Sequence, residues 1–380
     1  MKRSMVAVVG VMAVVLAVGA GRAEASTINL DNLNWSVQYM IDQSQTVLGV
    51  NQFSMPRDNR GLAISPDGQY LYAGYNNPSS AYEVRKIDLS AADYTAATVA
   101  HLVAASRGKA IAVDDGGRVF LGDATSIKIY DANLTTLQHT ITISGGALEG
   151  VATVREGSQL VLYNSDRTTG YLSRWLLTEA AGAVTGAALD SSWGSSGQVS
   201  LAANIRGVEV DSAGRIWVAG YGTSKVYVVS ADGLSYQSID SVVKPMDIGL
   251  DGSRALVTQY TERKIGVFDT STLSLLTSVT VPWAALELDS DGQSGGGALS
   301  GIVVLPGVGF YVTNEAGQTA GEKSIYGLTD ANSGWLDGKY YTDLTHDDND
   351  PILFATPEPA TLALLALGGA SLLVRRRRGK

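Results

Sequence analysis

Short apolar runs separated by tight turns recur along most of the chain. Between residues 60 and 89, apolar runs at 62–64, 70–74 and 82–89 are separated by Ser65-Pro66-Asp67-Gly68 and by a polar loop. Proline fixes φ at the first turn position, and glycine supplies the positive φ that closes the turn. This stretch therefore predicts three antiparallel strands.

The same pattern of strand, turn and strand appears six times. The six first strands begin, at intervals of 38 to 57 residues, with Arg60, Arg107, Glu149, Arg206, Lys244 and Ser300. A third strand follows in each repeat, and ATVAHLV, LQHTITIS, SYQSIDSVV and SLLTSVTV are typical of fourth strands. Four strands in a period of about 40 residues are typical of propeller blades. We therefore expect an all-β fold, a six-bladed β-propeller, with seven blades as the alternative.

The sixth repeat lacks an obvious fourth strand. We expect the strand around Trp35 to supply it and to close the ring, with residues 335–341 as the competing segment. The longer repeats contain Gly- and Ser-rich insertions at 191–198 and 289–297, which we expect in surface loops. Residues 343–355 are acidic and without periodicity, so they predict a linker between the propeller, residues 26–342, and the C-terminal segment.

Residues 1–25 have the layout of a secretory signal peptide. Lys2 and Arg3 precede an apolar run over residues 5–20, and Ala23-Glu24-Ala25 follows it. A charged start, an apolar centre and an A-x-A site define such signals, with cleavage here after Ala25. An apolar run of about sixteen residues is short for a membrane span. The sequence therefore predicts export.

The C-terminal residues 356–380 have three distinct parts. Pro357, Glu358 and Pro359 precede an apolar run over residues 361–374, and Arg375, Arg376, Arg377 and Arg378 follow it. A short apolar helix with a basic cluster predicts a weak membrane span whose end stays in the cytoplasm. Together the three parts resemble a PEP-CTERM sorting signal. The resemblance implies a Gram-negative-type bacterium, recognition and cleavage near Pro-Glu-Pro by the membrane-embedded enzyme exosortase, and only transient anchoring. It also implies a place at the cell surface or in the extracellular matrix, in association with exopolysaccharide and biofilm.

Residues 60–330 resemble the propellers of the YVTN, NHL and gluconolactonase-like classes. Tyr311-Val312-Thr313-Asn314 spells the first signature, and Ser65-Pro66-Asp67-Gly68 is its usual turn. These motifs are structural, so the resemblance implies a fold and little about function.

Composition and charge exclude several kinds of site. The 380 residues include no cysteine, which excludes disulfides and thiolate metal ligands. The formal net charge is −9 although both ends are basic, so the propeller itself is acidic and nucleic acid is not an expected partner. The three histidines, His101, His139 and His346, are dispersed, which argues against a His-based metal or acid–base site.

The residues that begin the first strands are candidates for ligand binding, because the first strand of a blade lines the central channel. Arg60, Arg107, Arg206 and Lys244, with Glu149 among them, would form a ring that attracts an anionic group such as an acidic sugar. The alternative is that these side chains pair with carboxylates or carbonyls of neighbouring blades and only hold the ring together.

The gluconolactonase-like resemblance also implies a divalent cation held by Glu, Asn and Asp in the channel. Glu149, Glu209 and Asp247 are the candidate ligands for Ca²⁺ or Zn²⁺. Their places differ between repeats, and pairing with Arg206 or Lys244 is the simpler use for buried carboxylates. We therefore expect a non-enzymatic module without a cofactor that binds exopolysaccharide or a matrix protein. The alternative is a metal-dependent lactonase or lyase acting on sugars.

Overall fold

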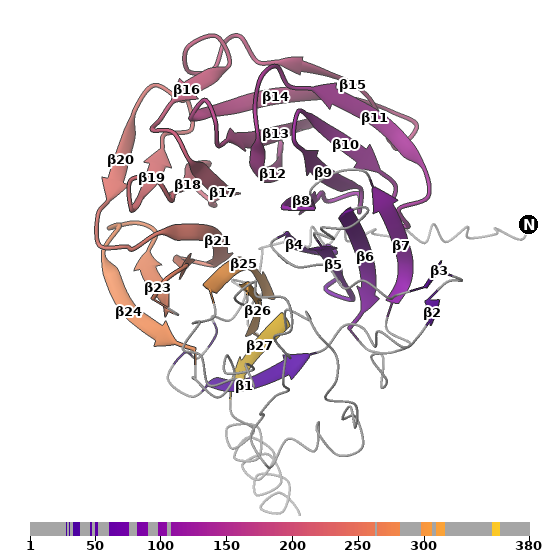
Figure 1. The fold of residues 1–380 in the computed structure, drawn as a ribbon. Coiled ribbons are helices and arrows are strands. Elements are labelled where there is room, and N and C mark those ends of the chain that lie inside the picture. The colour runs from indigo at the N-terminus through magenta and orange to yellow at the C-terminus, as the bar shows by residue number, and fades with distance from the viewer. Residues whose placement is uncertain are drawn as a thin grey trace, which may run out of the picture.

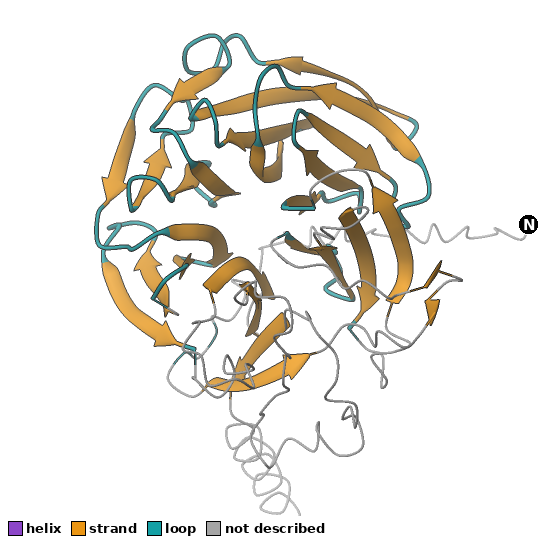
Figure 2. Cartoon of the chain, in the orientation of Figure 1, coloured by secondary structure: helices purple, strands orange, loops and turns teal. Residues whose placement is uncertain are grey.

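The protein is all-β in the part of the chain that the structure describes. The computed structural model describes residues 28, 30, 33–38, 46–47, 50–51, 61–75, 82–89, 98–104, 108–262, 264–281, 298–305, 309–315 and 352–357. Within these ranges the elements are strands joined by turns and loops, arranged around a central axis (Figures 1 and 2). The predicted propeller-like architecture is therefore confirmed.

Five blades follow the predicted plan of consecutive antiparallel strands. We number these blades 1 to 5 in chain order, and blade 3 has a fifth strand, β16, which pairs with β14. The blades consist of β4 (Leu62–Ile64), β5 (Tyr70–Tyr75), β6 (Tyr82–Asp88) and β7 (Thr98–Ala104); β8 (Ala110–Val113), β9 (Val119–Asp123), β10 (Ser126–Tyr130) and β11 (Leu137–Thr142); β12 (Leu148–Glu156), β13 (Gln159–Asp166), β14 (Tyr171–Ala180), β15 (Ala183–Leu189) and β16 (Gln198–Ser200); β17 (Ile205–Val210), β18 (Ile216–Gly220), β19 (Lys225–Val229) and β20 (Tyr236–Ile239); and β21 (Pro245–Asp251), β22 (Arg254–Gln259), β23 (Lys264–Asp269) and β24 (Leu275–Thr280).

A further four-stranded sheet, which we call the closing sheet, combines distant parts of the chain. Its order is β1 (Leu33–Gln38), β27 (Ile352–Pro357), β26 (Gly309–Glu315) and β25 (Ala298–Leu305). The prediction of six blades of one plan is thus wrong by one, because this sheet takes its outermost strand, β1, from the N-terminal part of the chain. The strand around Trp35 does join the sheet, as expected. Residues 335–341, the competing segment, lie outside the described residues.

Two more predictions about the chain's connections need correction or remain untested. The predicted linker, residues 343–355, ends inside β27, because Ile352 to Ala355 pair with β26. The insertion at 191–198 is not a simple surface loop, since Trp193 is buried and its indole N–H donates to the carbonyl of Ala231, 2.8 Å away, in blade 4. The insertion at 289–297 and both termini lie outside the described residues. The short pair β2 (Thr46–Val47) and β3 (Val50–Asn51) forms a separate two-stranded sheet.

The core lies between sheets. Apolar side chains of each sheet pack on the next, as with Trp217 of blade 4 and Phe268 of blade 5, which are both fully buried in one cluster. The predicted turn is confirmed: Gly68 has φ 71° and its N–H donates to the Ser65 carbonyl at 2.8 Å. Such turns reverse the chain, so that the second strand of a blade pairs with the first. The first strand, which we call the inner strand, lies next to the central axis.

The inner strands form a closed ring around the axis. Those of neighbouring sheets contact one another in the order β4, β8, β12, β17, β21 and β25, and β25 contacts β4. Side chains on these six strands therefore meet in one central channel, where both the predicted ligand ring and the predicted metal ligands would lie.

Candidate functional site: the central channel

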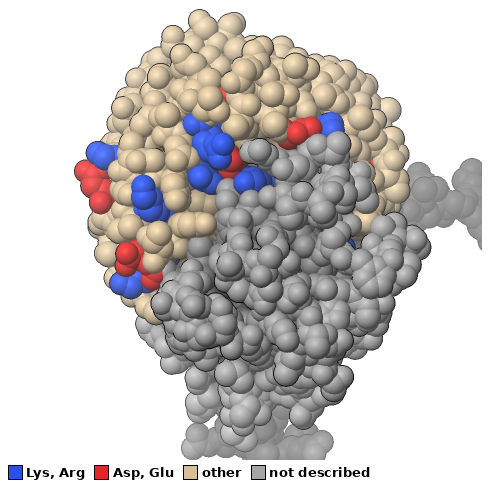
Figure 3. All heavy atoms as spheres, in the orientation of Figure 1, with Lys and Arg blue, Asp and Glu red and all other residues tan. Residues whose placement is uncertain are grey.

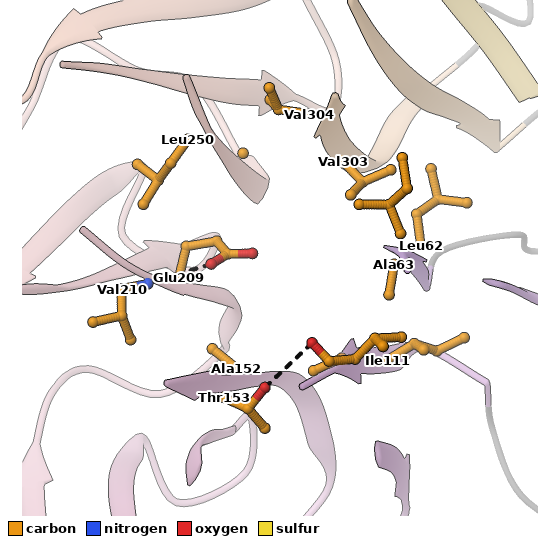
Figure 4. Close-up of a pocket in the computed structure, with 14 residues that line it drawn as sticks. Leu62, Ala63, Ile111, Ala152, Thr153, Glu209, Val210, Leu250, Val303 and Val304 are labelled. Atoms are coloured by element: carbon orange, nitrogen blue, oxygen red, sulfur yellow. Dashed lines mark hydrogen bonds between the residues drawn. The ribbon is translucent and has the colours of Figure 1, made fainter. Parts of the chain in front are cut away.

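The two ends of the channel differ in chemistry. At one end a narrow cavity is lined by Lys109, Glu149, Arg206, Met246, Asp247, Ser300 and Gly301. At the other end a wider cavity of about 250 Å³ is lined by inner-strand residues that are nearly all apolar (Figure 4). A charged end and an apolar end thus lie in series along the axis, and Glu209 and Asp247 lie between them.

The charged end is organised by a buried carboxylate between two arginines. Glu149, on β12, lies 3.2 Å from Arg167 Nη1 through Oε1 and 3.3 Å from Arg206 Nη1 through Oε2. The Arg206 side chain is 10% exposed and that of Glu149 2%, so this ion pair between blades 3 and 4 is shielded from solvent. Burying either charge alone would be unfavourable, and the pair therefore supports the packing of the two blades.

An aromatic ring lies close to two cations beside this pair. The Arg206 guanidinium carbon is 4.4 Å from the centroid of the Tyr221 ring, and Lys244 Nζ is 5.0 Å from the same centroid. Tyr260 packs against Tyr221 edge-on, with centroids 5.8 Å apart. Figure 3 shows Lys and Arg gathered near the middle of this face, over β12 and β17. The arrangement offers both positive charge and aromatic surface to a ligand at the channel mouth.

Two carboxyl groups from neighbouring blades lie deeper in the channel. Burial and the nearby Asp247 carboxylate raise the pKa of Glu209 to about 8, while burial raises the pKa of Asp247 to about 7. Asp247 Oδ2 accepts a hydrogen bond from the Ile302 N–H at 3.0 Å, which opposes the effect of burial. Both groups therefore carry less negative charge at neutral pH than surface carboxylates do.

Glu209 is the only ionisable residue among those that line the wide cavity. Its carboxyl group extends from β17 toward the middle of the cavity (Figure 4). One oxygen accepts a 3.3 Å hydrogen bond from the Val210 N–H. Thr153 also lines the cavity, and its hydroxyl group donates to the Val113 carbonyl at 3.5 Å. Apart from Glu209 and Thr153, the described lining residues have no polar side chain.

The structure brings three of the predicted strand-heading residues together. Among the described residues, Glu149, Arg206 and Ser300 line the narrow cavity with Lys109 and Met246. The sequence comparison did not single out Lys109 or Met246, which follow Arg107 and Lys244 by two residues. In blade 5 a shift of pairing between Pro245 and Ile248 displaces the strand. Arg60 and Arg107 lie outside the described residues, and Lys244 is placed beside Tyr221 instead.

The three predicted metal ligands meet but do not make a metal site. Glu149, Glu209 and Asp247 all line one narrow part of the channel. Both oxygens of Glu149 face arginines, and one oxygen of Asp247 already accepts a backbone hydrogen bond. Within the described ranges, no group of three or more His, Cys, Asp or Glu side chains is arranged to hold a metal ion. The residues present therefore do not fit the predicted Ca²⁺ or Zn²⁺.

Comparison with known families gives one match, at the C-terminus. Residues 355–378 match the family described as the PEP-CTERM protein-sorting motif. The chain carries a PEP-CTERM sorting signal. The signal implies recognition by exosortase during sorting and export to the cell envelope or surface of a Gram-negative bacterium. Among the described residues no helix is long and apolar enough to cross a membrane; the predicted sorting helix, with Arg375 to Arg378, lies outside them.

Solved structures resemble the propeller only at a low level of similarity. They include a protein of unknown function from Bacteroides caccae (12% identity, 65% of this chain and 90% of that chain covered, TM-score 0.46). A chain of a nidogen/laminin complex (12%, 67% and 95%, TM-score 0.47) and one of hydrazine synthase from Kuenenia stuttgartiensis (14%, 68% and 81%, TM-score 0.47) are similar to the same degree. A search of curated proteins found no match.

Proposed function

We propose that this PEP-CTERM protein is an exported, non-enzymatic binding module that holds an acidic glycan of the extracellular matrix at the charged end of its channel. The observation that carries the proposal is the placement of both Arg206 and Lys244 within about 5 Å of the centroid of the Tyr221 ring. Guanidinium groups bind carboxylates through paired hydrogen bonds, and aromatic rings provide a flat apolar surface. Sugars with carboxylate groups present both kinds of partner. The sorting signal supports a location where such glycans occur.

The local charge at this end differs from that of the whole protein. The chain is acidic, with a formal net charge of −9. Around the channel mouth, however, Lys109, Arg167, Arg206 and Lys244 lie near one ionised carboxylate, Glu149. The raised pKa of Asp247 reduces the negative charge just below them. An acidic surface with a positive channel mouth would direct anionic chains to the mouth alone.

Lys244 is the best residue with which to test the proposal. It is partly exposed, and it lies outside the buried Glu149–Arg206 pair, so replacing it does not leave a buried charge without its partner. We expect Lys244→Gln to weaken binding of an acidic polysaccharide such as alginate about tenfold, since one charge-assisted hydrogen bond contributes roughly 1.5–3 kcal/mol. Binding would be measured by calorimetry at two salt concentrations, because charge-dependent binding weakens as salt rises.

The matched control is Lys225→Gln. Lys225 lies at the start of β19 and pairs with Asp240 at 3.1 Å, away from the channel. The control is expected to bind alginate as the unaltered protein does. Equal binding by both variants, or no binding by the unaltered protein to any acidic glycan tested, would contradict the proposed function.

The alternative is an enzyme, a lactonase or lyase acting on sugars, and one observation favours it. Glu209 and Asp247 are neighbouring carboxyl groups with raised pKa values in a channel, which is typical of acid–base catalysts. Hydrolysis of a sugar lactone that is lost in Glu209→Gln would support the alternative.

A further inference from the structure

The sorting signal and the propeller share part of the chain. The signal begins at residue 355, whereas strand β27 runs from Ile352 to Pro357. The first residues of the signal therefore belong to the closing sheet. An extended substrate bound by an enzyme uses the same backbone hydrogen-bonding groups that a strand uses in a sheet. The shared residues cannot serve both the closing sheet and the enzyme at one time.

β27 lies between two other strands of the closing sheet, so it is paired on both sides. On one side Ile352 to Ala355 pair with Thr313 to Phe310 of β26. On the other side the whole strand pairs with β1, from Ile352 opposite Gln38 to Pro357 opposite Leu33. If β27 left, β26 would expose an unpaired edge, and β1 would lose the strand that holds it in the sheet.

The two prolines of the signal mark where the chain leaves the sheet. Proline has no N–H to donate to a strand ladder, so it is confined to strand ends and edges. Pro357 is the last residue of β27, and Pro359 follows two positions later. Glu358 is thus the first residue of the signal beyond the strand. Pro-Glu-Pro thus begins on the last paired residue of β27, and the rest of the signal follows that residue.

The segment between β27 and the apolar run of the sorting signal is short. Only residues 358–360 separate Pro357 from Thr361, where the apolar run begins. A fully extended chain covers at most about 3.5 Å per residue, so Pro357 lies within about 14 Å of the start of that run. While the C-terminal segment is uncut, the closing sheet must therefore lie next to the membrane surface in which exosortase is embedded.

We propose that β27 stays in the closing sheet while exosortase acts, so that the enzyme reads the signal from Glu358 onward on a folded propeller. Cleavage then releases a propeller that retains β27 and whose ring is already closed. This proposal rests on the sorting signal and on the pairing of β27, and it is independent of glycan binding at the channel. It assigns the closing sheet as the surface that faces the enzyme.

A reversible crosslink between β1 and β27 in the full chain tests the proposal. Val37 and Leu353 lie directly opposite each other in the two strands, and Leu353 precedes the signal. Directly opposite residues in antiparallel strands have Cα atoms about 4.5–5.5 Å apart, which suits a disulfide. Because the chain has no cysteine, the pair Val37→Cys with Leu353→Cys would form a single defined bond in the oxidising periplasm.

We expect the crosslinked chain to be cut and released in its host to the same extent as the single variants. Mass spectrometry of the released protein should show a C-terminus at or beyond Pro357. The matched control is Ser36→Cys with Leu353→Cys, in which neighbouring strand positions point to opposite faces and no bond should form.

Three results would overturn the proposal. The first is a crosslinked chain that accumulates uncut while the control pair is processed, because β27 must then leave the sheet before cleavage. The second is a released protein that ends before residue 357. The third is a folded, exported Val37→Cys/Leu353→Cys chain without the disulfide, because β1 and β27 would then not be paired in the protein that the enzyme meets.

Discussion

Gly207 and Asp247 occupy equivalent places in the inner strands of neighbouring blades, and the absence of a side chain at Gly207 makes room for the carboxyl group of Asp247. Pairing in both strands shifts at the same point, between Ile205 and Val208 in β17 and between Pro245 and Ile248 in β21. A Cβ on Gly207 would lie 2.6 Å from the Asp247 Cα and would overlap its Oδ1. The contact brings the two blades close enough for Glu209 and Asp247 to influence each other.

We expect Gly207→Ala to destabilise the protein by about 2–3 kcal/mol. The added methyl group would force β17 and β21 apart, since neither the Asp247 backbone nor the strand beneath it can move without disturbing the ring. Overpacking of a closed interior typically costs about 1–3 kcal/mol. The loss would be measured as a change in the free energy of unfolding by denaturant titration.

Gly186→Ala in β15 is the matched control. A Cβ there would meet Thr178 at ordinary contact distances of 3.5 and 3.6 Å. Alanine restricts the unfolded chain more than glycine does, so this variant should be neutral or slightly stabilised. Similar losses in both variants would show that the tight contact with Asp247 is not the cause.

The stability of the protein should fall as pH rises from about 5 to 9. Glu209 has a pKa of about 8 in the folded protein against an ordinary value of 4.5, and Asp247 has one of about 7 against 3.8. The folded state therefore binds more protons than the unfolded state in this window, so stability is greatest below it and is lost as these groups ionise. For Glu209 we expect a loss on the order of 5 kcal/mol, since the pKa rises from 4.5 to about 8 and each pKa unit corresponds to about 1.4 kcal/mol.

Glu209→Gln should remove about half of this dependence and be more stable than the unaltered protein at pH 9. Lys109, Glu149 and Asp247 share the channel with Glu209, and Asp247 would retain the other half. The surface residue Glu262 provides the control, as Glu262→Gln should leave the profile unchanged. Unfolding curves from pH 5 to 9 that are parallel for Glu209→Gln and the unaltered protein would contradict the raised pKa of Glu209.

Removal of the Glu149 carboxylate should be costly. Glu149→Gln would remove the carboxylate that faces both Arg206, whose side chain is 10% exposed, and Arg167. Breaking a buried ion pair typically costs about 3–5 kcal/mol. Glu156→Gln, which removes the partner of Arg174 where the Glu156 side chain is 45% exposed, should cost about 1 kcal/mol or less. Thermal unfolding of the two variants would show whether burial makes this difference.

The sequence predicted the strands well, because period-two apolar runs and Gly-containing turns are local signals. Ser65-Pro66-Asp67-Gly68 forms the expected turn, and the strand around Trp35 joins the last sheet. Residues 352–355 of β27 fall in the predicted acidic linker, because they directly follow a polar stretch and directly precede the sorting signal. The pairing of β27 with strands about 40 and more than 300 residues away leaves no local trace in the sequence.

The site was harder to predict than the fold. Comparison of the repeats made Lys244 equivalent to Arg206, whereas in the structure Met246 is equivalent to Arg206 and Asp247 to Gly207. An offset of two residues keeps every side chain on the same face of its strand, so the apolar pattern could not reveal it. The pairing of Glu149 with two arginines depends on blade contacts that no single repeat encodes.

The segment that precedes β1 should depend on Asp251. Asp251 Oδ2 accepts a hydrogen bond from the Ile28 N–H at 3.0 Å, and Arg254 donates to the Ile28 carbonyl at 2.6 Å. Ile28 itself is buried in the core between blade 5 and the closing sheet. We expect Asp251→Ala to raise hydrogen exchange at the Ile28 amide and to destabilise the protein by roughly 2 kcal/mol, since a buried donor and a cation lose their acceptor.

Asp269→Ala provides a comparison at a solvent-exposed turn. Asp269 accepts from Ser271 and Thr272 within its own turn, and these bonds lower its pKa to about 2. Its loss should loosen that turn without changing exchange at Ile28. If Asp251→Ala leaves the Ile28 amide as protected as before, apolar packing alone holds this segment. The N-terminal contribution to ring closure would then rest on Ile28 and on the pairing of β1 with β27.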